Sequence, residues 1–246
     1  MNKTYPLFKV IKWLIKVCYP KIKIEGIENL PESPSIIVAN HTQMHGPIAC
    51  EVHFPENSAI WCAGQMMKLK DVPKYAFEDF WSQKPKYTHP FYKLLSYLIA
   101  PLSVVIFKNA RTIGVYHDTR ILTTFKTTIK RLEEGKHIVI FPEYDKKYNN
   151  IIYDFQEKYI DIAKLYFKKT GKKLNFVPMY IAPNLKKMYI GEPIEFMGEK
   201  PISEERGEIS KYLMDEITNI AIHLPRHKVV PYRNIPKKQY PYNKEG

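Results

Sequence analysis

Cysteine is scarce in this chain of 246 residues, which has only Cys18, Cys50 and Cys62. Such an odd and sparse set excludes a disulfide framework and indicates a reducing compartment. An uncharged apolar run of bilayer length is also missing near the start, because lysines interrupt the stretch 7–19. That stretch has no signal-peptide cleavage pattern either. We therefore expect an intracellular protein.

Arginine is also rare, since only 6 of the 38 basic residues are arginine. Against 25 acidic residues the net charge is +13, which favours an acidic partner. Arginine is the usual reader of base edges, whereas lysine suits a diffuse anionic surface. The sequence has no helix-turn-helix, zinc-finger or RNA-binding signature. We expect an anionic membrane surface as the partner and no nucleic acid.

Apolar segments predict a single domain of the α/β class, with a mixed, mostly parallel sheet of about seven strands flanked by helices. The predicted strands are 21–25, 35–39, 59–63, 103–107, 137–141, 175–181 and 187–190. The predicted helices are 114–134, 153–170 and 203–223. Ser203 is the expected start of the last helix, and Gly171 the expected terminator of the one before it.

The two ends of the chain differ from this central segment, 21–224. Residues 1–20 predict an amphipathic helix whose lysines lie opposite an apolar face. It is typical of a helix in the headgroup plane of a membrane, or of a surface helix that covers the core. Residues 225–246 are rich in Pro, Tyr and Lys, a composition typical of an extended, partly disordered basic tail. Residues 71–100 are rich in aromatic rings and predict a helical core layer, an acyl-chain groove or a second membrane contact.

Four short segments place chemically useful residues at the ends of predicted strands, where open α/β sheets bind ligands. Asn40 and His41 follow the predicted strand 35–39, and Lys108 and Arg111 follow the predicted strand 103–107. The third segment is Phe141-Pro142-Glu143, and the fourth is the stretch 176–181, which contains Val-Pro.

In this order, and with the lead-in stretch 24–31, the segments resemble the motif blocks of glycerolipid acyltransferases of the lysophosphatidic acid acyltransferase type. The resemblance covers roughly residues 20–197. It implies a 1-acyl-sn-glycerol-3-phosphate acyltransferase-like enzyme of phospholipid biosynthesis, with 21–224 as its acyltransferase domain. Such an enzyme moves a fatty acyl group from a thioester donor, acyl-CoA or acyl-carrier protein, to the hydroxyl of a lysoglycerophospholipid. It needs no cofactor and no metal, and we expect it as a peripheral protein on the cytoplasmic face of the cell membrane.

The resemblance also implies roles for single residues. His41 becomes the general base that takes the proton of the acceptor hydroxyl, a task that suits a neutral imidazole. Lys108 and Arg111 lie where the family grips the acceptor phosphate. The implied catalytic residues are His41, His45 and Glu143, and the implied substrate-binding residues are Asn40, Lys108, Arg111, Phe141 and Pro142.

Three departures from the family pattern bear on activity. Gly46 stands where the family has the aspartate that fixes the tautomer of the histidine. Phe107 and Arg111 are four residues apart instead of three, and Tyr144 replaces the glycine after Phe-Pro-Glu. A catalytically impaired member that binds lipid is therefore the alternative to an active enzyme. We favour compensation, in which another polar group holds the His41 ring; His45, Glu143 and Glu51 are the candidates.

Zinc binding is a further alternative. Histidines and cysteines gather in one part of the sequence, and His41 and His45 have the i, i+4 spacing of helical zinc ligands. The remaining members of this group are Cys50, His53 and Cys62. Thr42 occupies the position of the glutamate that a metalloprotease motif requires, which argues against this interpretation.

Overall fold

The structure is a computed structural model that describes residues 4–116 and 118–245. Residues 1–3 of the predicted first helix, His117 of the predicted helix 114–134 and Gly246 of the tail lie outside the described residues. The α/β class and the mixed, mostly parallel sheet of about seven strands flanked by helices are confirmed. The chain packs into two compact units, one made of residues up to Pro20 with Ile60–Thr124, the other of Lys21–Ala59 with Phe125–Gly246.

In the second unit, the main sheet of the described residues runs in the order β1-β9-β8-β2-β5. Their bounds are β1 Lys23–Glu25, β2 Ser35–Ala39, β5 His137–Ile140, β8 Asn175–Ala182 and β9 Lys187–Ile190. β2 pairs in parallel with both β5 and β8, β1 pairs in parallel with β9, and β8 and β9 are antiparallel. The short β10 (Ile194–Glu195) pairs antiparallel with β8.

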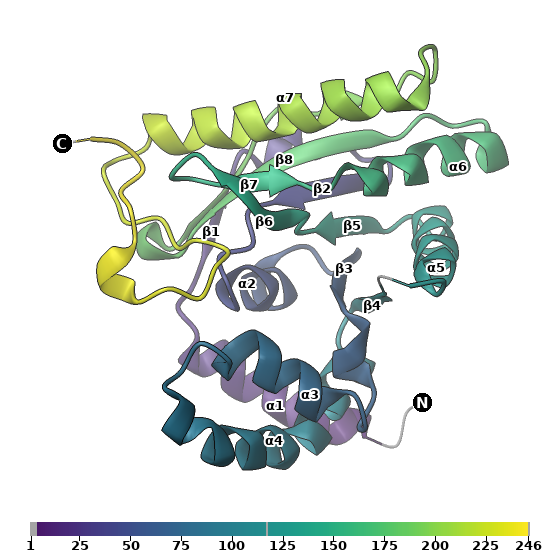
Figure 1. The fold of residues 1–246 in the computed structure, drawn as a ribbon. Helices are drawn as coiled ribbons and strands as arrows, with labels where there is room; N and C mark the ends of the chain where they lie inside the picture. Colours follow the sequence, from purple (N-terminus) through teal and green to yellow (C-terminus); the bar gives the residue numbers. More distant parts are fainter. Residues whose placement is uncertain (1–3, 117, 246) are drawn as a thin grey trace. The chain divides into compact units, whose positions relative to one another are not determined.

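The central strands of this sheet are covered on both faces. Every residue of β2 and β5 is buried, as are all of β8 except its first residue. Near-continuous apolar runs of this kind are typical of interior parallel strands. The helices of this unit are α2 (His45–His53), α6 (Asp161–Thr170) and α7 (Ile202–His223), and α5 (Ile121–Glu133) lies mostly within it. A hairpin of β6 (Glu143–Tyr148) and β7 (Tyr153–Phe155) follows β5 (Figure 1).

The first unit combines helices with one strand pair. Its helices include α1 (Tyr5–Cys18), α3 (Val72–Ala76) and α4 (His89–Asn109), and β3 (Ser58–Ala63) pairs in parallel with β4 (Thr112–Val115). A small core forms where Met66 and the buried face of α3 meet Ala100 of α4. The ring-rich stretch thus contributes to a helical core layer, as one of the three interpretations predicts.

Four sequence-based predictions of secondary structure are wrong. The predicted helix 114–134 starts in β4, and its helical part, α5, begins only at Ile121. The stretch 103–107 is not a strand but the end of α4, and the strand that follows it is β4. The predicted helix 153–170 is β7 at its start, and its helical part, α6, begins only at Asp161. Ser203 does not start the last helix, because Pro201 precedes its first turn. Gly171 does terminate α6, in the left-handed conformation with φ 72°.

Helices α1 and α4 leave much of their apolar surface uncovered. Phe8 is the one buried residue of α1. Side chains at helical spacing are exposed on both helices: Leu7, Val10, Trp13, Leu14 and Val17 on α1, and Phe91, Leu94, Tyr97, Leu98 and Leu102 on α4. The two helices contact each other, and Asn109 Nδ2 donates a hydrogen bond to Thr4 Oγ1. The stretch Lys86–Asn109 has the length and composition to cross a membrane, by those two criteria only.

Residues 227–243, close to the end of the chain, are tied to other parts of the second unit. Residues 227–243, here called the strap, form a loop closed at its base by hydrogen bonds between the His227 and Asn243 backbones and side chains. The Asn243 amide also donates to the Ala221 carbonyl, and Tyr180 of β8 contacts the His227 ring at 2.9 Å. The strap is the yellow segment of Figure 1. It therefore differs from the extended, partly disordered tail that its composition suggests.

Candidate active site

His41 lies just past the carboxyl end of β2, in the turn that leads to α2. Asn40 fixes the start of this turn, because its amide donates to the Ile181 carbonyl (3.0 Å) and accepts from the Ile181 N–H (2.7 Å). The next two residues, Thr42 and Gln43, have φ values of 48° and 54°. Left-handed backbone at residues other than glycine costs about 1–3 kcal/mol each and gathers at functional sites. The turn is thus strained and needs outside contacts to hold it.

Two aromatic rings pack against the His41 ring. Phe141 meets it edge to face at 5.2 Å between centroids, and Tyr232 of the strap does so at 5.4 Å. His41 is half-buried as a residue, but its Nδ1 atom is buried and has no hydrogen-bond partner among the described residues. Burial lowers the pKa of His41 to about 4, and the nearby Gln43 backbone opposes this drop. The imidazole is therefore neutral at neutral pH.

Glu143 contacts the turn through the backbone and not through the imidazole. Its Oε1 accepts from the His41 N–H (2.6 Å), and its Oε2 accepts from the Tyr153 N–H of β7 (2.8 Å). The side chain is buried, which raises the pKa of Glu143 to about 7, while the two backbone N–H groups oppose that rise. Glu143 thus ties the His41 turn to the β6–β7 hairpin.

None of the proposed substitutes for the missing aspartate holds the ring. His45 is the first residue of α2, is exposed, and makes no hydrogen bond to His41; Glu143 binds only the backbone. Nδ1 of the His41 ring has no hydrogen-bond partner among the described residues, so the structure does not bear out compensation by His45, Glu143 or Glu51.

Gly46 is packed too tightly to carry a side chain. A Cβ atom there would lie 2.4 Å from the His41 carbonyl oxygen and 3.0 Å from a ring carbon of Phe141. The carbonyl belongs to the backbone, so the turn itself would have to move. The Phe141 ring therefore lies in the space that a side chain at this position needs.

Phe141, Pro142 and His45 are the remaining predicted site residues of this unit. Phe141 and Pro142 directly follow β5, and the Pro142 carbonyl accepts from the Gln156 N–H at 2.9 Å. His41 precedes α2, so the helical spacing proposed for His41 and His45 does not exist. Within residues 4–116 and 118–245, no three or more His, Cys, Asp or Glu side chains gather as a metal site would require. The structure gives the zinc hypothesis no support.

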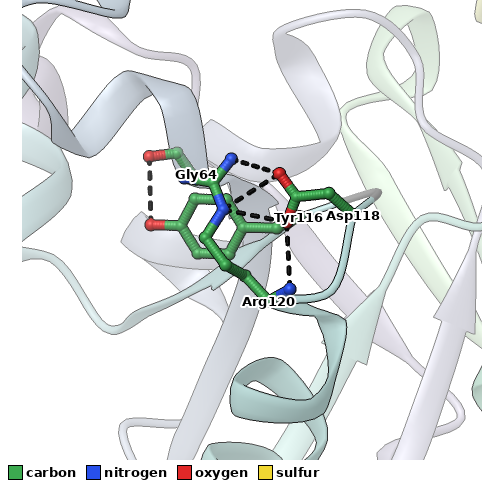
Figure 2. Close-up of polar contacts among 4 residues, drawn as sticks. All are labelled: Gly64, Tyr116, Asp118 and Arg120. Carbon is green, nitrogen blue, oxygen red and sulfur yellow. Dashed lines mark hydrogen bonds and ion pairs between the residues drawn. The ribbon is translucent and has the colours of Figure 1, made fainter.

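Lys108 and Arg111 of the first unit do not follow a strand. Lys108 is exposed in the last turn of α4, and Arg111 precedes β4, so the prediction that a strand end presents them is wrong. The cation after β4 is Arg120. Its Nε donates to both carboxylate oxygens of Asp118 at 2.8 and 3.0 Å, as Figure 2 shows.

Tyr116 supports this cation. The Arg120 guanidinium lies 4.2 Å from the Tyr116 ring centroid, and Lys68 Nζ lies 5.3 Å from the same centroid. The Arg120 ion pair lowers the pKa of Asp118 to about 2. The first unit thus presents two cations on one aromatic ring beyond the carboxyl ends of β3 and β4.

The sequence reasoning missed Tyr232, Tyr153 and the grip of the strap on the turn. Gln43 donates from Nε2 to the Arg233 carbonyl (3.0 Å) and accepts from the Tyr240 hydroxyl (3.2 Å). The signal in the sequence was the three tyrosines of the strap, because large rings of this kind are more often packed than left in solvent.

Comparison with known proteins finds similarity among solved structures only. No protein-family model matches the chain, and no curated protein does. Among solved structures, the 1-acyl-sn-glycerophosphate (LPA) acyltransferase PlsC from Thermotoga maritima is similar at 14% identity and a TM-score of 0.49, over 92% of this chain and 86% of that chain. A likeness of this degree does not by itself establish a family or a function for the chain.

Proposed function

We propose that the chain is an acyltransferase that moves a fatty acyl group from a thioester donor to the hydroxyl of a lysoglycerophospholipid. The observation that carries this proposal is the neutral imidazole of His41 at the carboxyl end of β2, beside the Phe141-Pro142-Glu143 segment at the end of β5. The ordered motif blocks of the sequence support the same reaction. The donor is acyl-CoA or acyl-carrier protein, and no further cofactor takes part.

The chemistry needs a base and little else from the protein. An imidazole nitrogen of His41 takes the proton of the acceptor hydroxyl as its oxygen attacks the thioester carbonyl carbon. The carbon–sulfur bond then breaks. The sulfur leaves as a thiolate and takes the proton back from the protonated His41, which gives the free thiol. Because a thiolate is a good leaving group, base catalysis is the main chemical task, worth about 10²–10⁴-fold.

Glu143 acts as a positioning residue in this proposal. Its carboxyl group accepts from the His41 backbone N–H, which fixes where β2 delivers the imidazole. Asn40 does the same from the other side by occupying both backbone groups of Ile181. In this proposal neither side chain contacts the substrate.

Within the first unit, we propose Arg120, with Lys68, as a binder of a phosphate group, in preference to Lys108 and Arg111. Parallel strands bind ligands beyond their carboxyl ends, and Arg120 follows β4 whereas Arg111 precedes it. Asp118 leaves the Nη1 donors of Arg120 without a hydrogen bond among the described residues. An arginine whose plane is fixed on a tyrosine and whose outer donors remain available is suited to bidentate phosphate binding.

The proposed location is the cytoplasmic face of the cell membrane, with α1 and α4 lying in the interface. Both helices expose apolar side chains, and Trp13 and Tyr97 supply rings of the kind that settle at headgroup level. Neither helix contains an acidic residue, and both carry lysines. A surface that is apolar and cationic fits an anionic bilayer.

A second candidate is a member that binds lysophospholipid but transfers acyl groups slowly. The unpartnered Nδ1 of His41 favours it, because among the described residues no hydrogen bond to Nδ1 fixes the tautomer that places the basic nitrogen toward the hydroxyl. In the serine-protease triad, neutralising the orienting aspartate lowers kcat about 10⁴-fold. The two candidates differ in turnover and not in ligand.

A donor and acceptor panel tests the proposal. Purified protein is incubated on anionic vesicles with acyl-CoA or acyl-carrier protein and a set of lysophospholipids, and products are identified by mass spectrometry. We expect a diacyl product from wild type and very little from His41→Ala. Binding of lysophospholipid without any product would leave the lipid-binding candidate, and neither binding nor product would reject both.

A further inference from the structure

The strap (residues 227–243) contacts the His41 turn at two places. Tyr232 packs edge to face on the imidazole at 5.4 Å and 77°, and the buried Nδ1 of that ring has no hydrogen-bond partner among the described residues. Gln43, two residues after His41, donates to the strap carbonyl of Arg233 and accepts from the Tyr240 hydroxyl. The strap therefore contacts both the His41 ring and Gln43 of the strained turn.

The strap is itself anchored by contacts with β6, β7 and β8. Tyr232 also meets the Tyr153 ring of β7 at 6.1 Å, and Arg233 forms an ion pair with Asp145 of β6 at 3.2 Å. At its base, His227 Nδ1 bonds the Pro225 carbonyl at 2.7 Å while Nε2 faces the buried Tyr180 hydroxyl. Because the carbonyl only accepts, Nδ1 carries the proton and Nε2 accepts from the tyrosine.

The space around His41 explains why an aromatic ring is used. A side chain at Gly46, where the motif aspartate belongs, would collide with the His41 carbonyl and with Phe141. Phe141 fills that side of the imidazole and Tyr232 fills another, each within the range of favourable aromatic pairs. Two edge contacts fix the plane of the imidazole, whereas a carboxylate would also fix its tautomer.

We propose that Tyr232 is a positioning residue for His41: with Phe141 it forms an aromatic clasp that orients the imidazole in place of the motif carboxylate. The strap is then part of the active site, and the hydrogen bonds of Gln43 connect it to the turn. This inference rests on the proposed function for its catalytic meaning. The clasp itself has a readout that needs no activity.

The clasp also keeps water from the imidazole, which gives that readout. Enclosure lowers the pKa of His41, so opening the clasp returns it toward the ordinary value of 6.5. The ionisable groups that face this turn include Glu143 of β6, Tyr153 of β7, His45 of α2, and Arg233, Lys237 and Tyr240 of the strap. None of them is removed by a substitution at Tyr232, so a change in the titration of His41 reports the clasp.

The test compares Tyr232→Ala, Tyr232→Phe and Tyr242→Ala in the full chain. Tyr242 is the matched control, a strap tyrosine whose ring packs on Arg226 at 3.6 Å instead of on His41. The His41 resonance, assigned by its loss in His41→Gln, is followed by nuclear magnetic resonance from pH 3.5 to 8. We expect the midpoint to rise toward 6.5 in Tyr232→Ala and to stay near 4 in wild type and the other two variants.

Acyl transfer is measured on the same four proteins. Tyr232→Ala is expected to lower kcat about 2- to 10-fold, the effect of losing one orienting aromatic contact, with little change in the KM of either substrate. Tyr232→Phe should keep the wild-type kcat, because it keeps the ring. An unchanged His41 midpoint in Tyr232→Ala would overturn the clasp. An equal shift in Tyr242→Ala would also overturn it, because the strap as a whole and not Tyr232 would then be responsible. A wild type without transfer would reject the proposed function, and the titration would still decide the clasp.

Discussion

The two buried ionisable groups of the turn predict opposite effects of pH on folding. Burial lowers the pKa of His41 from 6.5 to about 4 and raises the pKa of Glu143 from 4.5 to about 7. The shifts are therefore each about 2.5 units and opposite in direction. At about 1.4 kcal/mol per unit, each is equivalent to roughly 3 kcal/mol of the free energy of unfolding.

The sign of each effect follows from proton binding. Between pH 4.5 and 7 folded Glu143 holds a proton that the unfolded chain has released, so its contribution to the free energy of unfolding falls as pH rises. Between pH 4 and 6.5 folded His41 lacks a proton that the unfolded chain binds, so its contribution rises with pH. From about pH 4.5 to 6.5 the two contributions nearly cancel in wild type.

Single substitutions separate the two effects. Glu143→Gln removes the falling contribution, and its stability should rise by roughly 3 kcal/mol from pH 4 to 6.5. His41→Gln removes the rising one, and its stability should fall by a similar amount from pH 4.5 to 7. The double variant should again be nearly flat, apart from the groups that all four proteins share.

Urea unfolding at half-unit steps of pH, followed by circular dichroism, gives the four stability profiles. All four proteins keep the remaining ionisable groups, so differences between profiles isolate the pair. A Glu143→Gln profile parallel to that of wild type would show that Glu143 does not titrate in this range. The account of a buried carboxyl group under the His41 turn would then be refuted.

Three other expectations follow from the site and the first unit. Gly46→Asp should destabilise the fold and fail to raise turnover, because a Cβ there lies 2.4 Å from a backbone carbonyl oxygen; thermal unfolding and kcat check both, and a faster, stable variant would contradict this. Arg120→Ala should raise the KM of phosphorylated acceptors and leave donor hydrolysis unchanged, whereas Lys108→Ala should change neither. If the two variants raise this KM equally, Arg120 has no special role. Replacing Trp13 and Leu98 with serine should weaken sedimentation with anionic vesicles while thermal stability holds, because both side chains are exposed, at 61% and 67%; unchanged sedimentation would reject the interfacial helices.

The sequence predicts the central sheet well because its strands are continuous apolar runs. β2 and β5 are fully buried, and strands that are buried on both faces read as continuous apolar runs in the sequence. The same reasoning locates His41 and Phe141, since each lies within two residues of the end of such a strand. Strand ends are set locally, and so are the residues they present.

The sequence misleads where packing overrides local preference. The β-branched residues of 104–106 favour a strand by themselves, but they end a helix that begins at His89 and packs on α3. The strap has the composition of a tail, yet Asn243 and His227 close it into a loop. Glu143 shows a third limit: its contact with the His41 backbone joins residues 102 apart in the chain and depends on the tertiary fold.

The central claim is that His41 is the base of an acyl transfer, and a single-turnover rate tests it most directly. His41→Ala is compared with His223→Ala, which removes an exposed histidine at the end of α7. With acyl donor and lysophospholipid bound at saturation, the rate of ester formation is read by mass spectrometry. The account predicts a loss of about 10²–10⁴-fold in His41→Ala and none in His223→Ala. Ester formation by His41→Ala at the wild-type rate would contradict it.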